Sequence, residues 1–392
     1  MDWSNWLAEQ QLARQKENLQ RNRFAHSGRQ GSILSVGESQ FINFSSNDYL
    51  GLAGHPALSQ SLAESAAVNG VGSGASHLVC GHSEIHHQLE AALAAFVGAE
   101  RVLLLSSGYM ANIGLPQALT SRDDLILSDR LNHASLIDGI RLSRAKKRRF
   151  RHCDIEHAQL QAEQQKFSRC LVLTDGVFSM DGDIAPIQEL RLLSNKNNGL
   201  LLVDDAHGLG VVGSGGRGSL YASTAGGEFI DFESVLLMGT LGKAFGCYGA
   251  FVAGNANLIE HISQTCRSYI YTTALPPAIA ACALSALELV KQGELTKKLH
   301  TNIQYFVSQA KAYDLPILTS SSAIQVLLVG DNIRVMNLSN MLRDKGFLVG
   351  AIRPPTVPEG TARLRITLSS THKIEQIDRL LIELRKAMDD EL

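Results

Sequence analysis

Short apolar runs alternate with helix-length stretches through the middle of the chain. From about residue 98, these runs occupy residues 102–105, 125–127, 170–173, 200–203, 235–238 and 250–253. Each run is long enough for one buried strand, and the stretches between most of them are long enough for a helix. The alternation predicts an α/β fold built on a mostly parallel sheet.

The two ends of the chain have a different pattern. Residues 2–24 carry isolated Trp and Leu residues among charges, which predicts a sparse amphipathic helix that lies against another surface. The chain has 392 residues, which is more than a single domain with one hydrophobic core usually contains. Its hydrophobic content of 45% is sufficient for the cores of two domains. We expect an N-terminal segment at 1–44, a large α/β domain at 45–290 and a smaller C-terminal α+β domain at 291–392.

Composition narrows the class of protein further. A formal net charge of −2 gives no overall attraction to nucleic acid or to an anionic membrane. The six cysteines form no C-x-x-C pair and no metal-ligand spacing, which is typical of reduced thiols in a cytoplasmic protein. The N-terminus has no apolar h-region, and the longest apolar stretch, Ala278 to Val290, is too short to span a bilayer. We therefore expect a cytoplasmic protein with no membrane segment and no metal site.

Polar residues follow several of the apolar runs. In open α/β sheets, ligands bind at the carboxyl ends of the strands, so these residues are the first candidates for a site. After 102–105 comes a turn that contains Gly108 and Tyr109 and opens into a helix, whose free N–H groups could bind a phosphate; an ordinary helix cap is the alternative. After 170–173, Ser179 could hydrogen-bond a bound ligand.

The run 235–238 ends in a small-residue turn that presents Lys243 close to the hydroxyl of Thr240. A lysine amine held in this way could bind the aldehyde of pyridoxal 5′-phosphate (PLP) as a Schiff base. Asp204 and His207 follow the run 200–203, where a carboxylate could keep the pyridine nitrogen protonated and a histidine could reach the ring oxygen. The Asp-Asp-x-His string could instead be part of a metal site, but no second His or Cys lies nearby at ligand spacing.

His133 lies in a loop shortly after the run 125–127. A single histidine is more often a structural residue, although at a strand end it could also stack on a flat ring or move protons.

Six short motifs occur together along the chain: N-F-S-S-N-D-Y-L-G-L at 43–52, N-H-A-S at 132–135, D-G-V-F-S-M-D-G-D at 175–183, D-D-A-H-G at 204–208, G-R-G-S at 216–219 and T-L-G-K at 240–243. In this order they resemble the α-oxoamine synthases, PLP-dependent enzymes of fold type I, over nearly the whole chain. The resemblance implies an aminotransferase-like fold and a homodimer with shared active sites.

The resemblance also implies roles for individual residues. It implies Lys243, Asp204 and His207 as the groups at the cofactor aldehyde, pyridine nitrogen and ring oxygen, and His133 as the ring stacked on the cofactor. For the cofactor, it further implies Ser179 near the ring oxygen and Gly108, Tyr109 and Thr240 around the phosphate, which Thr272 and Thr273 would reach from a second subunit. For the substrates, it implies Arg353 and Thr356 at the amino-acid carboxylate, and Arg21 and Asn47 as further contacts.

Residues 322–325, 329–332 and 351–358, continuing to Arg365, are similar to the branch of the family that serves biotin biosynthesis. That branch implies a decarboxylative condensation of L-alanine with a pimeloyl thioester, either pimeloyl-CoA or pimeloyl-acyl carrier protein, which releases carbon dioxide and a free thiol. Residues 240–245 are also similar to 2-amino-3-ketobutyrate CoA ligase, which uses glycine and acetyl-CoA.

Two features do not follow from the resemblance. The first is a basic cluster of seven cations within residues 141–151, which could be a solvated face, a contact for the phosphates of a CoA-type substrate or, as a remote alternative, a nucleic-acid site. We expect no nucleic-acid partner. The second is His82, at a position where the family pattern gives no reason for a histidine; His86 and His87 are expected to be surface or packing residues.

Overall fold

The computed structural model describes residues 2–21, 23–222, 230–318 and 320–390. These residues form two compact units. The smaller unit contains Met1–Tyr49, Met180–Gly182 and Lys298–Leu392, and the larger one contains Leu50–Ser179 and Asp183–Lys297. The boundaries expected from the sequence are at residues 45 and 291, with a separate N-terminal segment. In the structure, residues 1–49 belong to the same unit as residues 298–392.

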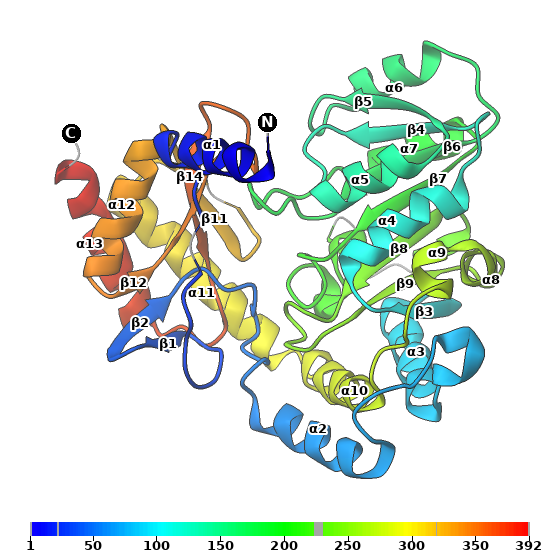
Figure 1. Cartoon of the computed structure of the whole chain (residues 1–392), viewed down its shortest axis with the longest axis horizontal. Coiled ribbons are helices and arrows are strands. Elements are labelled where there is room, and N and C mark those ends of the chain that lie inside the picture. Colours follow the sequence, from blue (N-terminus) through cyan, green and yellow to red (C-terminus); the bar gives the residue numbers. More distant parts are fainter. Residues whose placement is uncertain (1, 22, 223–229, 319, 391–392) are drawn as a thin grey trace. The chain divides into compact units, whose positions relative to one another are not determined.

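The larger unit is built on a seven-stranded sheet with the order β3-β9-β8-β7-β6-β4-β5 (Figure 1). The strands are β3 (Arg101–Leu105), β4 (Leu125–Asp129), β5 (Lys146–Phe150), β6 (Cys170–Asp175), β7 (Gly199–Asp204), β8 (Val235–Thr240) and β9 (Ala250–Gly254). Strand β9 pairs antiparallel with both β3 and β8, and the other strands run in one direction. The prediction of a mostly parallel α/β sheet is therefore confirmed.

Each of the six apolar runs forms one strand of this sheet, because its side chains are buried. In β4, for example, Leu125, Ile126 and Leu127 are fully buried. Helices α4 (Gly108–Leu119), α5 (Ala134–Leu142), α8 (Ala256–Thr265) and α9 (Arg267–Ile270) contribute to one hydrophobic cluster with the strands. Burial of such side chains stabilises the fold by about 1.5–3 kcal/mol each, and it fixes the strand ends that carry the polar residues.

The remaining helices of the larger unit connect or flank the strands. They are α2 (Pro56–Asn69), the π-helical turn His77–Gly81, α3 (Glu84–Val97), α6 (Ile155–Glu163), α7 (Ile187–Lys196) and α10 (Pro277–Lys291), and α11 (Glu294–Ala312) begins in this unit and continues into the smaller one.

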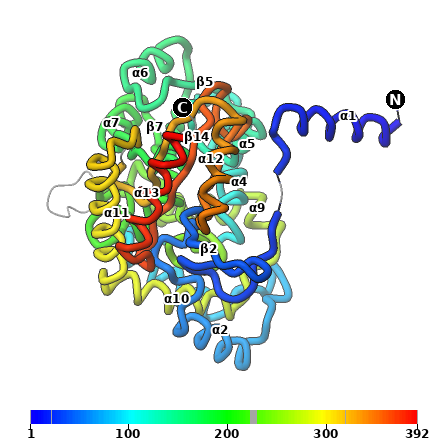
Figure 2. The backbone as a smooth tube through the Cα atoms, turned by 90° about the vertical axis from the view of Figure 1, so that its left-hand side faces the viewer, coloured from blue at the N-terminus to red at the C-terminus, as the bar shows by residue number. Residues whose placement is uncertain are grey.

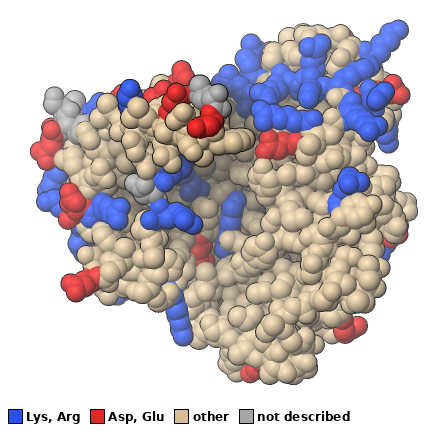
Figure 3. Space-filling model, in the orientation of Figure 1, with Lys and Arg blue, Asp and Glu red and all other residues tan. Residues whose placement is uncertain are grey.

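Strand β5 was not predicted from the sequence, because it reads Lys-Lys-Arg-Arg-Phe and has no apolar run. It forms an edge of the sheet and pairs only with β4. Much of the basic cluster therefore lies on an edge strand, where Lys146, Lys147 and Arg149 are exposed. Figure 3 shows Lys and Arg gathered over the part of the molecule where Figure 1 places β5 and α6. Charged side chains on an edge strand oppose pairing with the edge of another sheet, which favours a solvated face.

The smaller unit has two sheets, β1-β2-β12 and β10-β11-β14-β13. Helices α12 and α13 pack side by side in this unit (Figure 2). The strands are β1 (Ile33–Val36), β2 (Ser39–Asn43), β10 (Ile317–Leu318), β11 (Ile324–Gly330), β12 (Phe347–Leu348), β13 (Gly350–Ile352) and β14 (Ala362–Thr367), and the helices are α1 (Trp3–Lys16), α12 (Asn332–Asp344) and α13 (Ile374–Asp390). Strand β1 was not predicted from the sequence, because only Leu34 is buried in it and it therefore has no clear alternation of apolar and polar residues.

Helix α1 confirms the helix expected near the N-terminus, and none of its residues is buried. Among the described residues, no helix has both the length and the apolar character required to cross a membrane.

Candidate active site

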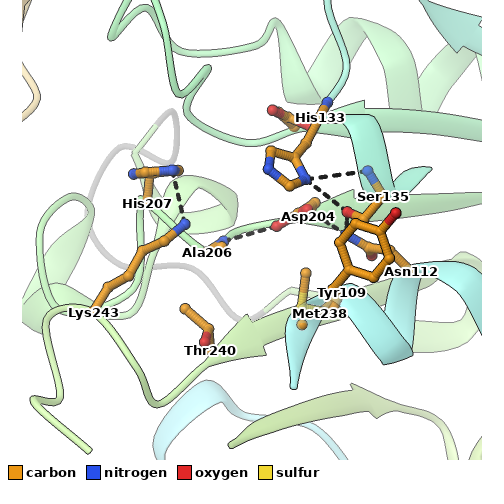
Figure 4. A pocket seen from close by; sticks show the side chains of 12 residues that line it. Tyr109, Asn112, His133, Ser135, Asp204, Ala206, His207, Met238, Thr240 and Lys243 are labelled. Carbon is orange, nitrogen blue, oxygen red and sulfur yellow. Dashed lines mark hydrogen bonds between the residues drawn. The ribbon is translucent and has the colours of Figure 1, made fainter. Parts of the chain in front are cut away.

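A cavity of about 200 Å³ lies at the carboxyl ends of the parallel strands in the larger unit (Figure 4). Seven of the residues predicted from the sequence line it. They are Gly108, Tyr109, His133, Asp204, His207, Thr240 and Lys243. The parallel strands bring them together, because residues that follow neighbouring strands in the same direction meet at one edge of the sheet.

Lys243 follows β8 on a turn that backbone hydrogen bonds hold in place. The amide of Gly246 donates to the carbonyl oxygen of Lys243 at 2.8 Å, and the amide of Cys247 donates to that of Leu241 at 2.8 Å. The Nζ atom of Lys243 lies 2.8 Å from Nε2 of His207, which follows β7. The amine is therefore directed toward the cavity and has a histidine as its immediate neighbour (Figure 4).

Asp204 is the last residue of β7 and is 5% exposed. Its Oδ2 accepts a hydrogen bond from Nδ2 of Asn112 at 2.6 Å, and its Oδ1 accepts one from the amide of Ala206 at 3.0 Å. Asn112 lies on α4 and also donates to Ser135 at 2.9 Å. These hydrogen bonds hold the buried carboxylate in place at the wall of the cavity.

His133 is the N-cap of α5, and its Nδ1 accepts a hydrogen bond from the amide of Ser135 at 3.3 Å. The Oγ of Ser135 lies 2.7 Å from the same nitrogen. The backbone amide of His133 donates to Oδ1 of Asp175 at 3.0 Å. The loop after β4 is thus attached to the end of β6, which fixes the imidazole at the wall of the cavity.

Burial and neighbouring charges set the protonation of these groups. Burial lowers the pKa of His133; the nearby Asp204 carboxylate opposes this effect, and the Lys243 cation adds a smaller decrease. The pKa of Asp175 is well above its usual range because the carboxyl is completely buried and lies near Asp204. A neutral imidazole is therefore favoured at neutral pH, and a second negative charge beside Asp204 is disfavoured.

The opposite wall of the cavity begins at the N-terminus of α4, which Ser107 caps through a hydrogen bond from the amide of Met110 at 3.3 Å. Gly108 and Tyr109 form the first turn of this helix, and the Tyr109 hydroxyl donates to Asp138 at 2.6 Å. Thr240 lies nearby at the end of β8 and accepts a hydrogen bond from the amide of Gly242 at 3.2 Å. Free amides at a helix N-terminus bind anions such as phosphate.

The other predicted residues do not line this cavity. Ser179 is buried near the end of the larger unit's first segment, and Thr272 and Thr273 follow α9. In the smaller unit, Arg21 donates to Thr356 at 3.1 Å, and the Arg353 guanidinium donates to the carbonyl oxygen of Asn18. Asn47, also in that unit, accepts a hydrogen bond from Arg365 at 3.2 Å.

Sequence reasoning did not identify five of the lining residues, namely Asn112, Ser135, Asp175, Ala206 and Met238. Asp175 and Ser135 belong to the motifs at 175–183 and 132–135, and both follow predicted strands. Their positions could therefore have marked them as candidate site residues. Asn112 has no such signal, because it faces Asp204 across 92 positions of sequence.

The donor set fits PLP. A lysine amine, a buried carboxylate with two donors and a helix N-terminus line one cavity, and they match an aldehyde, a basic ring nitrogen and a phosphate. Asn112, which also lines the cavity, has a buried Oδ1 atom without a hydrogen-bond partner in the described structure.

Comparison with known proteins defines the class first. Residues 39–384 match the family of class I and II aminotransferases. Among solved structures, a serine palmitoyltransferase from S. paucimobilis with a bound PLP–myriocin aldimine is similar, with a TM-score of 0.91, 28% sequence identity and coverage of 100% of this chain and 99% of the other.

Curated relatives define the family within that class. The 8-amino-7-oxononanoate synthase of Methylococcus capsulatus is 50% identical over 89% of this chain and 90% of its own length, and that of Alcanivorax borkumensis is 46% identical over 98% and 99%. A crystal structure of the synthase from Francisella tularensis is similar with a TM-score of 0.77 and 32% identity, covering 90% of this chain and 98% of the other. The chain belongs to the 8-amino-7-oxononanoate synthase family of the class I and II aminotransferases, which confirms the resemblance and the fold class.

Proposed function

We propose that this protein is a PLP-dependent enzyme that condenses L-alanine with a pimeloyl thioester to give 8-amino-7-oxononanoate, carbon dioxide and a free thiol. One observation carries the proposal: Lys243, His133 and Asp204 line one cavity, in a chain 46–50% identical to curated synthases named for this product. The product belongs to biotin biosynthesis.

Each wall of the cavity has a role in holding the cofactor. Lys243 would bind the aldehyde of PLP, Asp204 would pair with its pyridine nitrogen, His207 would contact the ring oxygen and His133 would pack against the ring. The N-terminus of α4 at Gly108 and Tyr109, together with Thr240, holds the phosphate. When bound, PLP supplies an electron sink for the pair of electrons left on the substrate α-carbon.

The protein's own residues then move protons and hold the substrates. Lys243, whose amine lies at the cavity, would be the base that removes the α-proton of the amino acid and later returns one to the product. Asp204 keeps the pyridine nitrogen protonated, because a carboxylate at that atom stabilises the cation. His133, neutral through its lowered pKa, can donate one hydrogen bond toward the oxygen of the thioester carbonyl.

Arg353 is proposed to bind the amino-acid carboxylate, with Thr356 beside it and with Arg21 and Asn47 at the substrates. A guanidinium suits this role because its planar donors match both carboxylate oxygens. In the structure Arg353 uses those donors on carbonyl oxygens of the N-terminal segment, Asn18 and Gln20. These contacts show that its donors can be satisfied by oxygen acceptors.

We further propose a homodimer in which Thr272 and Thr273 of one subunit reach the phosphate bound by its partner, and Ser179 as a ligand of the ring oxygen. Pimeloyl-CoA and pimeloyl-acyl carrier protein are both chemically suitable donors, because each presents the same thioester.

The test is the visible absorbance of the purified protein with PLP, followed by addition of L-alanine and then of pimeloyl-CoA while free thiol is measured. A cofactor band that alanine perturbs, with thiol release from pimeloyl-CoA, is expected. Thiol release with glycine and acetyl-CoA instead would assign the protein to the 2-amino-3-ketobutyrate ligase reaction, and no band would contradict the cofactor.

Replacement of Lys243 by alanine removes both the covalent attachment and the base, so turnover should fall by about 10³-fold or more. The matched control is Lys196→Ala, because Lys196 is an exposed lysine of α7. A Lys243→Ala protein with the control's activity would refute the mechanism.

A further inference from the structure

A cluster of histidines lies outside the cavity, where the π-helical turn His77–Gly81 meets the start of α3. Within the described residues, one ring nitrogen each of His77, His82 and His86 lies within 4.8 Å of one ring nitrogen of each of the other two. His77 and His86 are buried, with exposed fractions of 8% and 0%. The proposed reaction uses none of these three side chains.

The His77 and His82 rings face each other through the same ring atom, Nδ1. Their Nδ1 atoms are 2.8 Å apart, so one ring must hold a proton there and the other a lone pair. The ring of His77 is also stacked on Tyr269, with centroids 5.3 Å apart and planes 11° apart. Two imidazoles are therefore directed at one point, and one of them is held in place by an aromatic ring.

The third ring is oriented by the backbone. Nε2 of His86 lies 2.5 Å from the carbonyl oxygen of Leu275, so this nitrogen carries the hydrogen and donates it. The lone pair is therefore on Nδ1, which accepts a hydrogen bond from the amide of Ser83 at 3.0 Å. A histidine that donates one N–H to a backbone carbonyl has the usual arrangement of a metal ligand, because that bond fixes the tautomer and the ring.

The His77 and His86 rings are buried, which limits their contact with water. Burial is the main cause of the lowered pKa of His77, His82 and His86, and the pKa of His77 falls to about 3. Neutral imidazoles are the form that binds metal ions. A second cluster, formed by Asp129, His152 and Cys153, differs in this respect, since hydrogen bonds from His152 to Asp129 and Asp183 raise the pKa of that histidine to about 12.

We propose that His77, His82 and His86 bind a divalent transition-metal ion, with Zn²⁺ as the ion that best suits three imidazoles and an open fourth position. Zinc–nitrogen bonds of about 2.0–2.1 Å in tetrahedral geometry place the nitrogens about 3.3 Å apart. The His77–His82 pair therefore opens by about half an ångström. The ring that carries the Nδ1 proton changes tautomer, so that the proton moves to its Nε2 and the freed Nδ1 lone pair binds the ion. His86 exchanges the contacts of its Nδ1 with the amide and the hydroxyl of Ser83, at 3.0 and 2.9 Å, for the metal.

A bound ion would connect three parts of the chain. His77 belongs to the π-helical turn, His86 to α3, and their contacts Tyr269 and Leu275 flank the segment that carries Thr272 and Thr273. The ion is therefore expected to reduce local opening of residues 269–275.

The test uses the full-length protein without an affinity tag and Zn²⁺ alone, in competition with a chromophoric chelator. One Zn²⁺ per chain is expected, with a dissociation constant of about 1 μM or tighter. His77→Gln and His82→Gln should each weaken binding by about tenfold or more. His26→Gln is the matched control, because His26 is exposed and lies in the other unit. Circular dichroism without metal checks that each variant is folded.

Two further variants identify the ligands. His87→Gln tests the neighbouring group of His82, His87 and Glu90, whose ligand atoms also lie within 4.8 Å of one another. Cys80→Ser tests the exposed thiol of the same turn. Binding that survives both His77→Gln and His82→Gln, or that is lost only in His87→Gln or Cys80→Ser, would overturn the proposal, as would a wild-type protein that binds no Zn²⁺ in this range.

The spectrum of bound Co²⁺ gives an independent readout. Three imidazoles and water should produce visible absorption bands of a four- or five-coordinate ion without a thiolate charge-transfer band. A thiolate band in the wild-type protein would place Cys80 in the first coordination sphere and contradict the assigned ligand set.

Discussion

At the scale of single residues, the chemistry of the site depends on a few buried polar groups that hold one another in position through hydrogen bonds. Asp204 illustrates this, because its two oxygens accept from Asn112 and from the amide of Ala206. The sequence identified Asp204 from its position after a strand. It could not identify Asn112, whose importance comes only from its distance of 2.6 Å to that carboxylate.

Replacement of Asn112 by alanine should weaken the binding of PLP. The change leaves one oxygen of a buried carboxylate without its donor, which costs about 1.5–3 kcal/mol, or roughly 10- to 100-fold in affinity. Cofactor titration followed by visible absorbance measures the effect. Gln117→Ala on the same helix is the control, because the Gln117 side chain donates to the carbonyl oxygen of Ile113, one turn earlier, and is not among the described residues that line the cavity. Equal affinities in the two variants would argue against a positioning role for Asn112.

Buried histidines also link stability to pH. His372 is 2% exposed, stacks on Phe44 with centroids 4.1 Å apart, and has its Nε2 3.0 Å from the carbonyl oxygen of Asn43. Burial lowers its pKa from 6.5 to about 4. Because the unfolded chain binds a proton that the folded protein does not, this contribution to stability is complete above pH 6.5 and is lost as the pH falls toward 4.

We expect the wild-type protein to lose about 2 kcal/mol of stability through His372 between pH 7 and pH 5. In His372→Gln this part of the loss should be absent, since an amide does not titrate in that range. Urea denaturation of both proteins at the two pH values measures the difference. An identical pH dependence in the variant would show that His372 does not contribute.

At the scale of elements, strand β5 shows how a charged sequence can still form part of a sheet. Its backbone pairs with β4 in register, from Lys146 opposite Leu125 to Phe150 opposite Asp129, while its cations remain exposed at the edge. No apolar run marks such a strand, so local pattern alone misses it.

Removal of charge from this edge should promote self-association. Lys147 and Arg149 are two positions apart on the strand, and their replacement by threonine removes two of its exposed charges, which weakens the barrier to pairing with another sheet. Light scattering against protein concentration should show a larger aggregated fraction than for the control Lys196→Thr and Arg122→Thr, which removes two exposed charges elsewhere. Similar scattering in the two double variants would mean that the position of the charges on β5 is unimportant.

At the scale of the whole molecule, the proposed homodimer predicts complementation between two inactive proteins. If the phosphate is bound by threonines of the partner, a Lys243→Ala chain mixed with a Thr272→Ala, Thr273→Ala chain forms mixed dimers with one intact site each. Random reassociation makes about half of the dimers mixed, so about a quarter of the sites should be active.

The measurement is thiol release after the two chains are unfolded together and refolded. Each chain refolded alone is the control and should remain inactive or strongly impaired. Tags of different size on the two chains show whether mixed dimers form. If they form without recovery of activity, both threonines lie in the same site as the lysine of their own chain.

The sequence by itself determined which apolar runs form strands, that Lys243 lies on a turn after β8, and that Asp204 lies at the end of β7. Each of these depends on patterns and spacings within a short stretch of chain. Its motifs were also sufficient to indicate the family. Only the tertiary structure decided that Asn112 supports Asp204, that a basic segment is an edge strand, and that His77, His82 and His86 converge. Asn112, for example, meets a residue 92 positions away, and the orientation of His86 depends on a carbonyl 189 positions away. The physical reason is that buried polar groups are satisfied by whatever the fold places beside them, and the fold brings together residues that no local pattern relates.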